Sequence, residues 1–255
     1  MTESAIRAIA GLTDVGQIRQ VNEDALLINN DVQLYAIADG MGGHGSGDVA
    51  SQLAVNTLQS CITSDAVSKA LAHKDISDKQ AQGLVYQCIV DVNQRIYREN
   101  VKKGHPDGTG MGTTLVGFCV FGDAQRAISF NIGDSRLYEY RDANLAQLTT
   151  DHTMYRDWEE NGRIGPPPPR NIILRAIGLF ADIDIDMDIL VLDPEATYLI
   201  CSDGLTGMIS DEQIASILAR PDSVQSLNDA LVHNANEHGG TDNITVVTLA
   251  PSHKN

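Results

Sequence analysis

The sequence predicts an α+β sandwich in which helices cover the outer faces of two antiparallel sheets. Two observations support this fold class. Short runs of alternating apolar residues are typical of strands, and the hairpin-length links between several of them imply antiparallel pairing. Segments with helical spacing of apolar residues come in two groups, one after the first strands and one after the later strands. Grouped helices are expected to form outer layers on the sheets.

The first part of the chain supplies three strands and two helices. Residues 5–13, 24–30 and 33–38 show strand patterns, and a polar turn at residues 29–31 joins the last two. Residues 47–61 carry apolar side chains at helical spacing. A second helix is expected over residues 78–100, with one apolar stripe formed by Leu84, Cys88, Val92 and Ile96.

The rest of the chain continues with strands and ends with helices and one strand. Gly-Asp turns separate three predicted strands, which are residues 113–121, 124–132 and 136–140. After a less regular stretch we expect strands at 184–192 and 196–202, helices at 211–219 and 222–238, and a strand at 244–249. Four consecutive prolines within residues 162–170 favour an extended loop, either a lid over a site or an inert surface loop.

Length and composition favour an ordinary globular domain. The 255 residues, 42% hydrophobic and 20% charged, contain no linker rich in Pro, Gly or Ser, so residues 1–255 are expected to form a single domain. A net charge of −16 argues against a nucleic-acid partner, because phosphate binding needs a basic surface. No apolar run approaches the roughly 20 residues that a membrane span requires, so no membrane partner is expected.

The cysteines and the N-terminus predict a cytoplasmic protein. Four cysteines are scattered without a CxxC pair, and Cys119 and Cys201 lie inside apolar runs, where they are expected to act as small core residues. This usage is typical of a reducing compartment, and no disulfide framework is expected. Residues 1–5 lack the basic region and following apolar stretch of a signal peptide.

Carboxylates stand repeatedly at the ends of apolar runs. Asp39-Gly40 and Asp203-Gly204 each follow such a run, Glu23-Asp24 stands just before another, and Asp242 opens the last one. One Asp-Gly pair alone is more often a simple turn. Together, however, these positions can direct several carboxylates from rigid supports toward one point. Hard oxygen ligands without His or Cys spacing suit Mg²⁺ or Mn²⁺ and not Zn²⁺.

Other motifs are weaker or exclude alternatives. The glycine-rich segment 40–47 lacks the Gly-Lys-Ser/Thr of a nucleotide loop, so its glycines more plausibly let a backbone carbonyl approach a metal. No Gly-x-Ser-x-Gly elbow is present, which removes the usual signal of a serine hydrolase. Arg19 is either a surface residue or a two-pronged ligand for a phosphate beside the carboxylates.

In order along the chain, these segments resemble the metal-dependent protein phosphatases of the type 2C (PPM) family in their compact bacterial form. The matching stretches extend over essentially the whole chain, from about residue 5 to 250. They are residues 16–24, 38–44, 112–115, 131–136, 148–152, 175–178, 201–205 and 241–245.

The resemblance implies a four-layer αββα sandwich of two antiparallel sheets, with a metal centre at one edge of the sheets. It implies two Mn²⁺ or Mg²⁺ ions, and a third, weaker one in bacterial members. The implied ligands are Glu23, Asp39, Gly40 through its carbonyl, Asp134 for the third ion, Asp203 and Asp242.

The resemblance also implies catalytic roles and a flap. Asp39 would bridge the two ions, and Arg19 would bind the substrate phosphate. Asp24 would not bind an ion directly but would contact a metal-bound water molecule. Residues 154–175 correspond to the flap beside the active site. Two departures stand out: Met41 occupies a position where many eukaryotic members have a His proposed as general acid, and the proline run replaces a more polar flap sequence.

The implied function is hydrolysis of phosphoserine and phosphothreonine in phosphoproteins by a water that metal ions activate. Expected partners are the phosphoprotein substrates and a Ser/Thr kinase or its targets, and the protein is expected to be a monomer. Two alternatives stay open from the sequence, a hydrolase of small phosphoesters and a non-catalytic binding module of the same fold.

Overall fold

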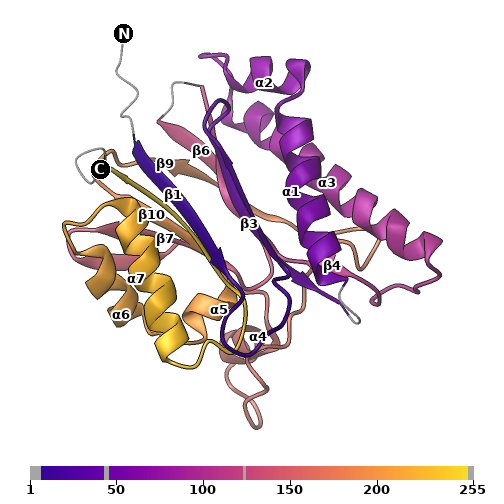
Figure 1. Cartoon of the computed structure of the whole chain (residues 1–255). Coiled ribbons are helices and arrows are strands. Elements are labelled where there is room, and N and C mark those ends of the chain that lie inside the picture. Colours follow the sequence, from indigo (N-terminus) through magenta and orange to yellow (C-terminus); the bar gives the residue numbers. More distant parts are fainter. Residues whose placement is uncertain (1–6, 43–45, 123–124, 252–255) are drawn as a thin grey trace.

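Two antiparallel sheets lie at the centre of the protein, and helices flank both (Figure 1). The computed structural model describes residues 7–42, 46–122 and 125–251. One sheet has the strand order β1-β11-β10-β7-β8. Its strands are β1 (Arg7–Asp14), β11 (Ile244–Pro251), β10 (Thr197–Cys201), β7 (Arg136–Arg141) and β8 (Asn144–Gln147).

The other sheet has the order β2-β3-β5-β6-β9, with the short strand β4 paired to β3. Its strands are β2 (Asp24–Asn29), β3 (Leu34–Met41), β4 (Gly112–Thr113), β5 (Leu115–Phe121), β6 (Arg126–Ile132) and β9 (Asp186–Val191). Every pairing in both sheets is antiparallel, as the hairpin-length links predict.

Helices from two separate parts of the chain form the outer layers. Beside the second sheet lie α1 (Gly47–Ile62), α2 (Asp65–Leu71) and α3 (Asp78–Lys102) (Figure 1). Beside the first lie α5 (Asp203–Thr206), α6 (Asp211–Leu218) and α7 (Val224–Glu237). The predicted αββα architecture is therefore confirmed. Among the described residues, no helix is both long and apolar enough to cross a membrane.

Period-two alternation along the strands produces three apolar layers. In β3, Leu34 and Ala36 pack with the α1 and α3 side chains, whereas Tyr35 and Ile37 face the other sheet. Between the sheets, the rings of Tyr35 and Phe118 lie 5.4 Å apart, and that of Tyr198 lies 6.0 Å from Phe118. A third buried cluster joins β10 and β11 to α6 and α7. Each sheet therefore packs against apolar side chains on both faces, and this packing fixes the positions of its strand ends.

Serine caps define where the predicted helices begin. Ser77 Oγ accepts a hydrogen bond from the Gln80 amide, and the Gln80 side chain accepts one from the Ser77 amide. Ser210 and Gln213 form the same reciprocal pair at the start of α6. These pairs satisfy amides that have no partner within the helix. The predicted helices 78–100 and 211–219 agree with α3 and α6 to within two residues at each end.

The sequence did not predict several short elements. They are α2, α5, β8 and α4 (Met154–Glu160), each of seven residues or fewer. Such short segments offer too few apolar positions to show a period, and α4 has no buried residue. In addition, β3 continues through Asp39 and Gly40 to Met41, because β4 pairs with its last two residues. Residues 5, 6 and 124 of the predicted strands lie outside the described residues.

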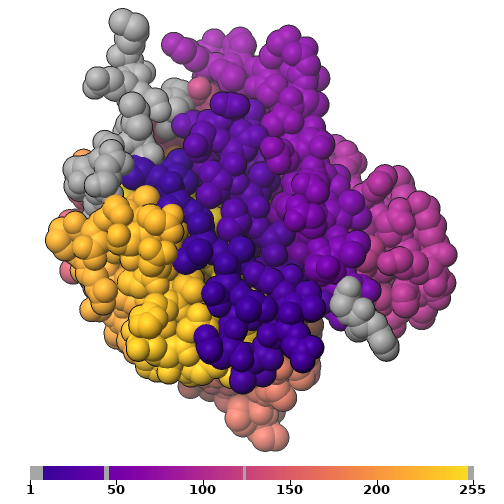
Figure 2. Space-filling view, viewed as in Figure 1, coloured from indigo at the N-terminus to yellow at the C-terminus, as the bar shows by residue number. Residues whose placement is uncertain are grey.

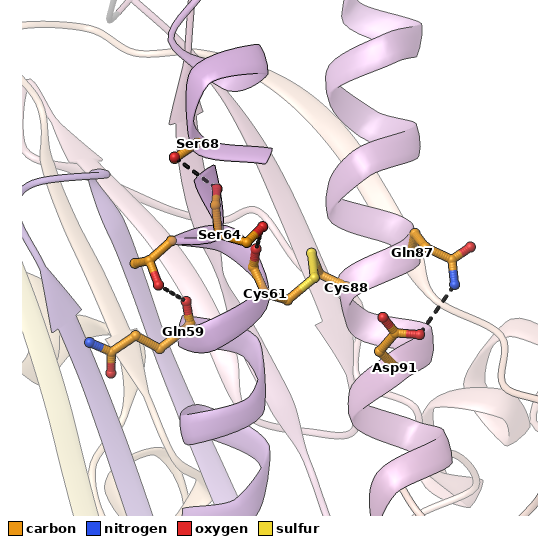
Figure 3. Close-up of a disulfide and its surroundings, with 8 residues drawn as sticks. Gln59, Cys61, Ser64, Ser68, Gln87, Cys88 and Asp91 are labelled. Atoms are coloured by element: carbon orange, nitrogen blue, oxygen red, sulfur yellow. Dashed lines mark hydrogen bonds between the residues drawn. A yellow bond between two sulfur atoms is a disulfide. The ribbon is translucent and has the colours of Figure 1, made fainter. Parts of the chain in front are cut away.

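The prediction that the cysteines form no disulfide is wrong for one pair. Cys61 at the end of α1 and Cys88 in α3 are joined, with their Cα atoms 5.6 Å apart (Figure 3). The two helices lie side by side, which brings together residues 27 apart in the sequence. Their spacing resembles no disulfide motif, so only helix packing reveals the pair. Cys119 and Cys201 are free and buried, as expected.

Candidate metal centre and adjoining groove

The first two predicted site carboxylates face each other across a strand pair. Asp24 opens β2 and lies opposite Asp39 in β3. The backbone of Asp39 is held from the neighbouring strands: its amide donates to Thr114 Oγ1 at 2.9 Å, and its carbonyl accepts from the Thr113 hydroxyl at 2.9 Å and the Thr114 amide at 2.8 Å. Asp39 is therefore fixed by the sheet and not by a flexible loop.

Gly40 and Glu23 occupy a close approach between β3 and the start of α1. A Cβ atom on Gly40 would collide with the backbone carbonyls of Gly47 and Glu23, so only glycine fits here. Glu23 Oε1 accepts a hydrogen bond from the Gly47 amide at 3.1 Å, at the first residue of α1. A carboxylate at this end is favoured because helix amides point toward it. Residues 43–45 of the glycine-rich segment, with His44, lie outside the described residues.

Asp24 is a buried carboxylate that is only half satisfied. Its Oδ2 accepts hydrogen bonds from Ser202 Oγ at 2.8 Å and Thr245 Oγ1 at 2.6 Å. Its Oδ1 is buried and has no hydrogen-bond partner among the described residues. Burial raises the pKa of Asp24 to about 6. The hydrogen bonds from the Thr245 and Ser202 hydroxyls lower this pKa, whereas the charges of Asp203 and Asp242 raise it further.

Asp203 and Asp242 reach the same region from the other sheet. Asp203 is the first residue of α5, directly after β10, and Asp242 lies just before β11. The carboxyl of Asp203 lies within hydrogen-bonding reach of that of Asp39. Burial and then Asp242 raise the pKa of Asp203, while burial and then Asp24 and Asp203 raise that of Asp39 well above its ordinary value.

Arg19 belongs to the loop between β1 and β2, which Asp242 and Asn243 hold in place. Its Nη2 donates to Asp242 Oδ2 at 2.8 Å, and its side chain is 48% exposed. Asn243 fixes the loop: its Nδ2 donates to the carbonyls of Val15 and Val21, and its Oδ1 accepts from the Glu23 amide at 2.8 Å. The guanidinium therefore stands at the edge of the carboxylate group with nitrogens open to solvent.

Asp134 follows the tight turn after β6 and is 6% exposed. Its Oδ1 has no hydrogen-bond partner among the described residues. Burial, followed by the nearby charge of Asp203, raises the pKa of Asp134 to about 7. Gly133 has φ +112°, and any Cβ there would meet Thr114, whose hydroxyl also contacts Ser135 Oγ at 2.8 Å.

The sequence-predicted site residues thus lie at one edge of the two sheets. The carboxylates and Gly40 are at or next to the ends of β2, β3, β10 and β11 or in the turn after β6, and Arg19 is in the loop between β1 and β2. In the described parts of the chain, no three Asp, Glu, His or Cys side chains already converge as a closed metal cage. After burial, the charges of Asp24, Asp203, Asp134 and Asp242 nevertheless each add to the rise in the pKa of Asp39.

The chemistry of this group of carboxylates suits bound cations that prefer oxygen ligands. Buried carboxylates with unpaired oxygens and raised pKa values repel one another when ionised, and bound cations would relieve both costs. The available donors are carboxylate and carbonyl oxygens, which are the ligands of Mg²⁺ and Mn²⁺.

Sequence reasoning did not single out the residues that hold the carboxylates. They are hydroxyl and amide side chains next to the acidic motifs, namely Thr113, Thr114, Ser202, Asn243 and Thr245. Their adjacency to the motifs was the available signal, but their targets lie far away in the sequence. Thr245 and Asp24, for example, are 221 residues apart.

His152 links the Asp134 turn to the flap, which we define as residues 154–175. The ring is buried, and its Nδ1 accepts from the Gly133 amide at 3.1 Å. Its Nε2 lies 3.0 Å from Asp186 and 3.1 Å from Arg175 Nη1. Its backbone carbonyl accepts from the Leu174 amide at 2.7 Å. The flap base is therefore attached to the turn that carries Asp134.

A groove of about 620 Å³ runs from the carboxylates to the flap. Asp134 and Asp203 line one end, and Tyr155, Arg156 and Arg170 line the other. The flap itself protrudes from the edge of the molecule, next to indigo and yellow parts of the surface (Figure 2). Its proline run has no regular secondary structure, as predicted.

Comparison with known proteins identifies the family. Residues 17–241 match the family described as protein phosphatase 2C. The serine/threonine phosphatase stp of Listeria welshimeri is 37% identical over 247 residues, which cover 93% of each chain. Since the match spans most of the chain, the protein belongs to the protein phosphatase 2C family and is a protein phosphatase. This confirms the resemblance.

Solved structures agree with this assignment. PppA, described as a key regulatory component of T6SS in Pseudomonas aeruginosa, superimposes with a TM-score of 0.81 at 30% identity, covering 96% of this chain and 97% of that one. The catalytic domain of the phosphatase PstP, in complex with two manganese ions, gives a TM-score of 0.79 at 32% identity with the same coverage. The family is metal dependent.

Proposed function

We propose that this protein hydrolyses phosphoserine and phosphothreonine in phosphoproteins at a centre of two divalent cations, Mn²⁺ or Mg²⁺. The observation that carries the proposal is the group of carboxylates at one sheet edge, in which Asp24 and Asp134 each have a buried oxygen without a partner among the described residues, with Arg19 beside the group. The match to phosphatases named for serine and threonine supports the substrate class. A third, weaker cation would use Asp134.

The proposed ligands divide between the two sheets. Asp39 would serve both ions, with Glu23 and the Gly40 carbonyl on one and Asp203 and Asp242 on the other. Bound cations would lower the pKa of a water molecule and neutralise charge on the phosphoryl group. The protein contributes positions: Thr113 and Thr114 hold Asp39, and Asn243 holds the Glu23 backbone.

Arg19 would bind the phosphoryl oxygens. Its described contact uses only Nη2, on Asp242, so its remaining N–H groups can form a two-pronged interaction with phosphate. Asp24 would orient water from behind the ligands, since Ser202 and Thr245 fix one of its oxygens and leave the other unpaired. Met41 ends β3 and cannot donate a proton, so the leaving alkoxide would take its proton from water or another group.

The groove favours a polypeptide substrate over a small phosphoester. A small phosphate would need only the carboxylate end, whereas the groove continues to the flap and offers room for residues beside the phosphorylated one. A non-catalytic role is disfavoured because all the proposed ligands are present. A kinase partner, a monomeric state and a cytoplasmic location stay predictions.

The test is turnover of phosphothreonine peptides with and without divalent cations. We expect no activity in EDTA, recovery with Mn²⁺ or Mg²⁺, and loss of activity in Asp203→Asn with unchanged circular dichroism. Asn keeps the volume of Asp and removes its charge, so the fold should survive. Full turnover in excess chelator after dialysis would disprove the metal-dependent mechanism.

A further inference from the structure

The groove beside the carboxylates contains charges that already have partners. Asp151 accepts two hydrogen bonds from Arg136, from Nε at 2.9 Å and Nη2 at 2.7 Å. Asp211 accepts from the Tyr138 hydroxyl at 3.0 Å. These groups neutralise or satisfy one another, so they offer little to a bound peptide.

The charged side chains of α4 that line the groove, Arg156 and Glu159, are likewise paired within the helix and its end. Arg156 Nε donates to Glu160 at 2.8 Å, and Glu159 accepts from Arg163 at 2.9 Å. Both pairs have the i,i+4 spacing that places side chains on one helix face. At the flap end of the groove, one charged side chain of the described residues is therefore still without an ion-pair partner.

That charge is Arg170, at the end of the proline run. Its Nη2 donates to the Tyr155 hydroxyl at 2.8 Å, and its guanidinium lies 3.9 Å from the centroid of the Tyr155 ring. Among the described residues, no carboxylate lies within ion-pairing distance of it. The side chain is exposed. Stacking on Tyr155 orients the guanidinium and leaves its other N–H groups available.

We propose that Arg170 is a docking cation for a second anionic group on the substrate, a carboxylate or a second phosphate, several residues from the phosphate that is hydrolysed. This inference rests on the proposed function. An extended peptide spans about 3.3 Å per residue, so one or two particular positions would reach Arg170 from the carboxylate end of the groove. Because the chain as a whole carries a net charge of −16, such a preference must come from a local contact and not from the overall field.

The experiment moves a single Glu, position by position, through an otherwise uncharged phosphothreonine peptide, with Gln in the same position as reference. At one or two adjacent positions we expect kcat/KM to be about fivefold higher for Glu, mainly through KM, as for an exposed but oriented ion pair. Phosphoserine at that position should give a larger ratio if phosphate is the preferred anion. The ratio should shrink as salt is added.

Three variants complete the test. Arg170→Gln should bring the ratio of kcat/KM for the Glu and Gln peptides close to one. Arg170→Lys should keep part of the preference for Glu, because lysine retains the positive charge but lacks the planar guanidinium group. Arg220→Gln removes another exposed arginine, after α6 and away from the groove lining, and should leave the ratio unchanged.

A flat profile in the wild-type protein, or a ratio that survives in Arg170→Gln, would overturn this inference while phosphopeptide turnover upheld the proposed function. If no phosphopeptide is turned over in the presence of Mn²⁺ or Mg²⁺, the proposed function fails, and the docking role fails with it.

Discussion

Replacing Asp134 by Asn should stabilise the metal-free protein at neutral and alkaline pH. Burial and the nearby charge of Asp203 raise the pKa of Asp134 from 3.8 to about 7. Between these pH values the native protein keeps a proton that the unfolded chain releases, so the free energy of unfolding falls as pH rises from about 4 and levels off above about 7. Asn has nearly the same shape and carries no charge at any pH.

The size of the effect follows from the pKa difference. A shift of about three units corresponds to about 4 kcal/mol of destabilisation by the ionised group. The new amide of Asn would cost about 1–3 kcal/mol if it found no partner. We therefore expect a net stabilisation of roughly 1–4 kcal/mol at pH 8, and no stabilisation at about pH 4.

The assay is urea unfolding in EDTA, followed by circular dichroism across this pH range. Asp182→Asn, at an exposed aspartate before β9, is the matched control and should change little. Saturating Mn²⁺ should remove or reverse the advantage of Asp134→Asn, because a ligand of the native state stabilises the protein that binds it more tightly. A variant that is less stable than wild type at pH 8 in EDTA would show that Asp134 is a structural turn residue.

Two further predictions concern Arg19 and the disulfide. Arg19→Ala should mainly raise KM for phosphopeptides, with a smaller fall in kcat, because the proposed role of the guanidinium is to bind phosphate and not the cations; steady-state kinetics would contradict this role if KM stayed unchanged. Cys61→Ser with Cys88→Ser should lower the free energy of unfolding by about 3.5 kcal/mol, as expected for a closed loop of this length. Turnover by the folded double variant should persist, since neither cysteine is among the proposed site residues, and equal urea midpoints with and without reductant in the wild-type protein would contradict the stabilising role.

The sequence by itself determined the layers and the acidic motifs of this protein. Strand and helix periods are local, so segments such as 78–100 and 244–249 could be assigned from neighbouring residues alone. Asp39 and Asp203 could be selected because each follows an apolar run, and a buried strand places its ends at fixed positions. The family resemblance then supplied the proposed roles of Glu23, Asp134 and Asp242, which their local patterns alone would not give.

Only the tertiary structure decided which groups hold those carboxylates and what lies beside them. Ser202, directly after β10, and Thr245 in β11 reach Asp24 from the other sheet, 178 and 221 residues away, and no local pattern encodes such pairings. Cys61 and Cys88 meet because α1 packs against α3. The groove, with Arg170 stacked on Tyr155, likewise forms when the flap folds beside the sheet edge. Periodicity reports which face of a segment is buried, whereas partners across the core depend on how separate segments pack in three dimensions.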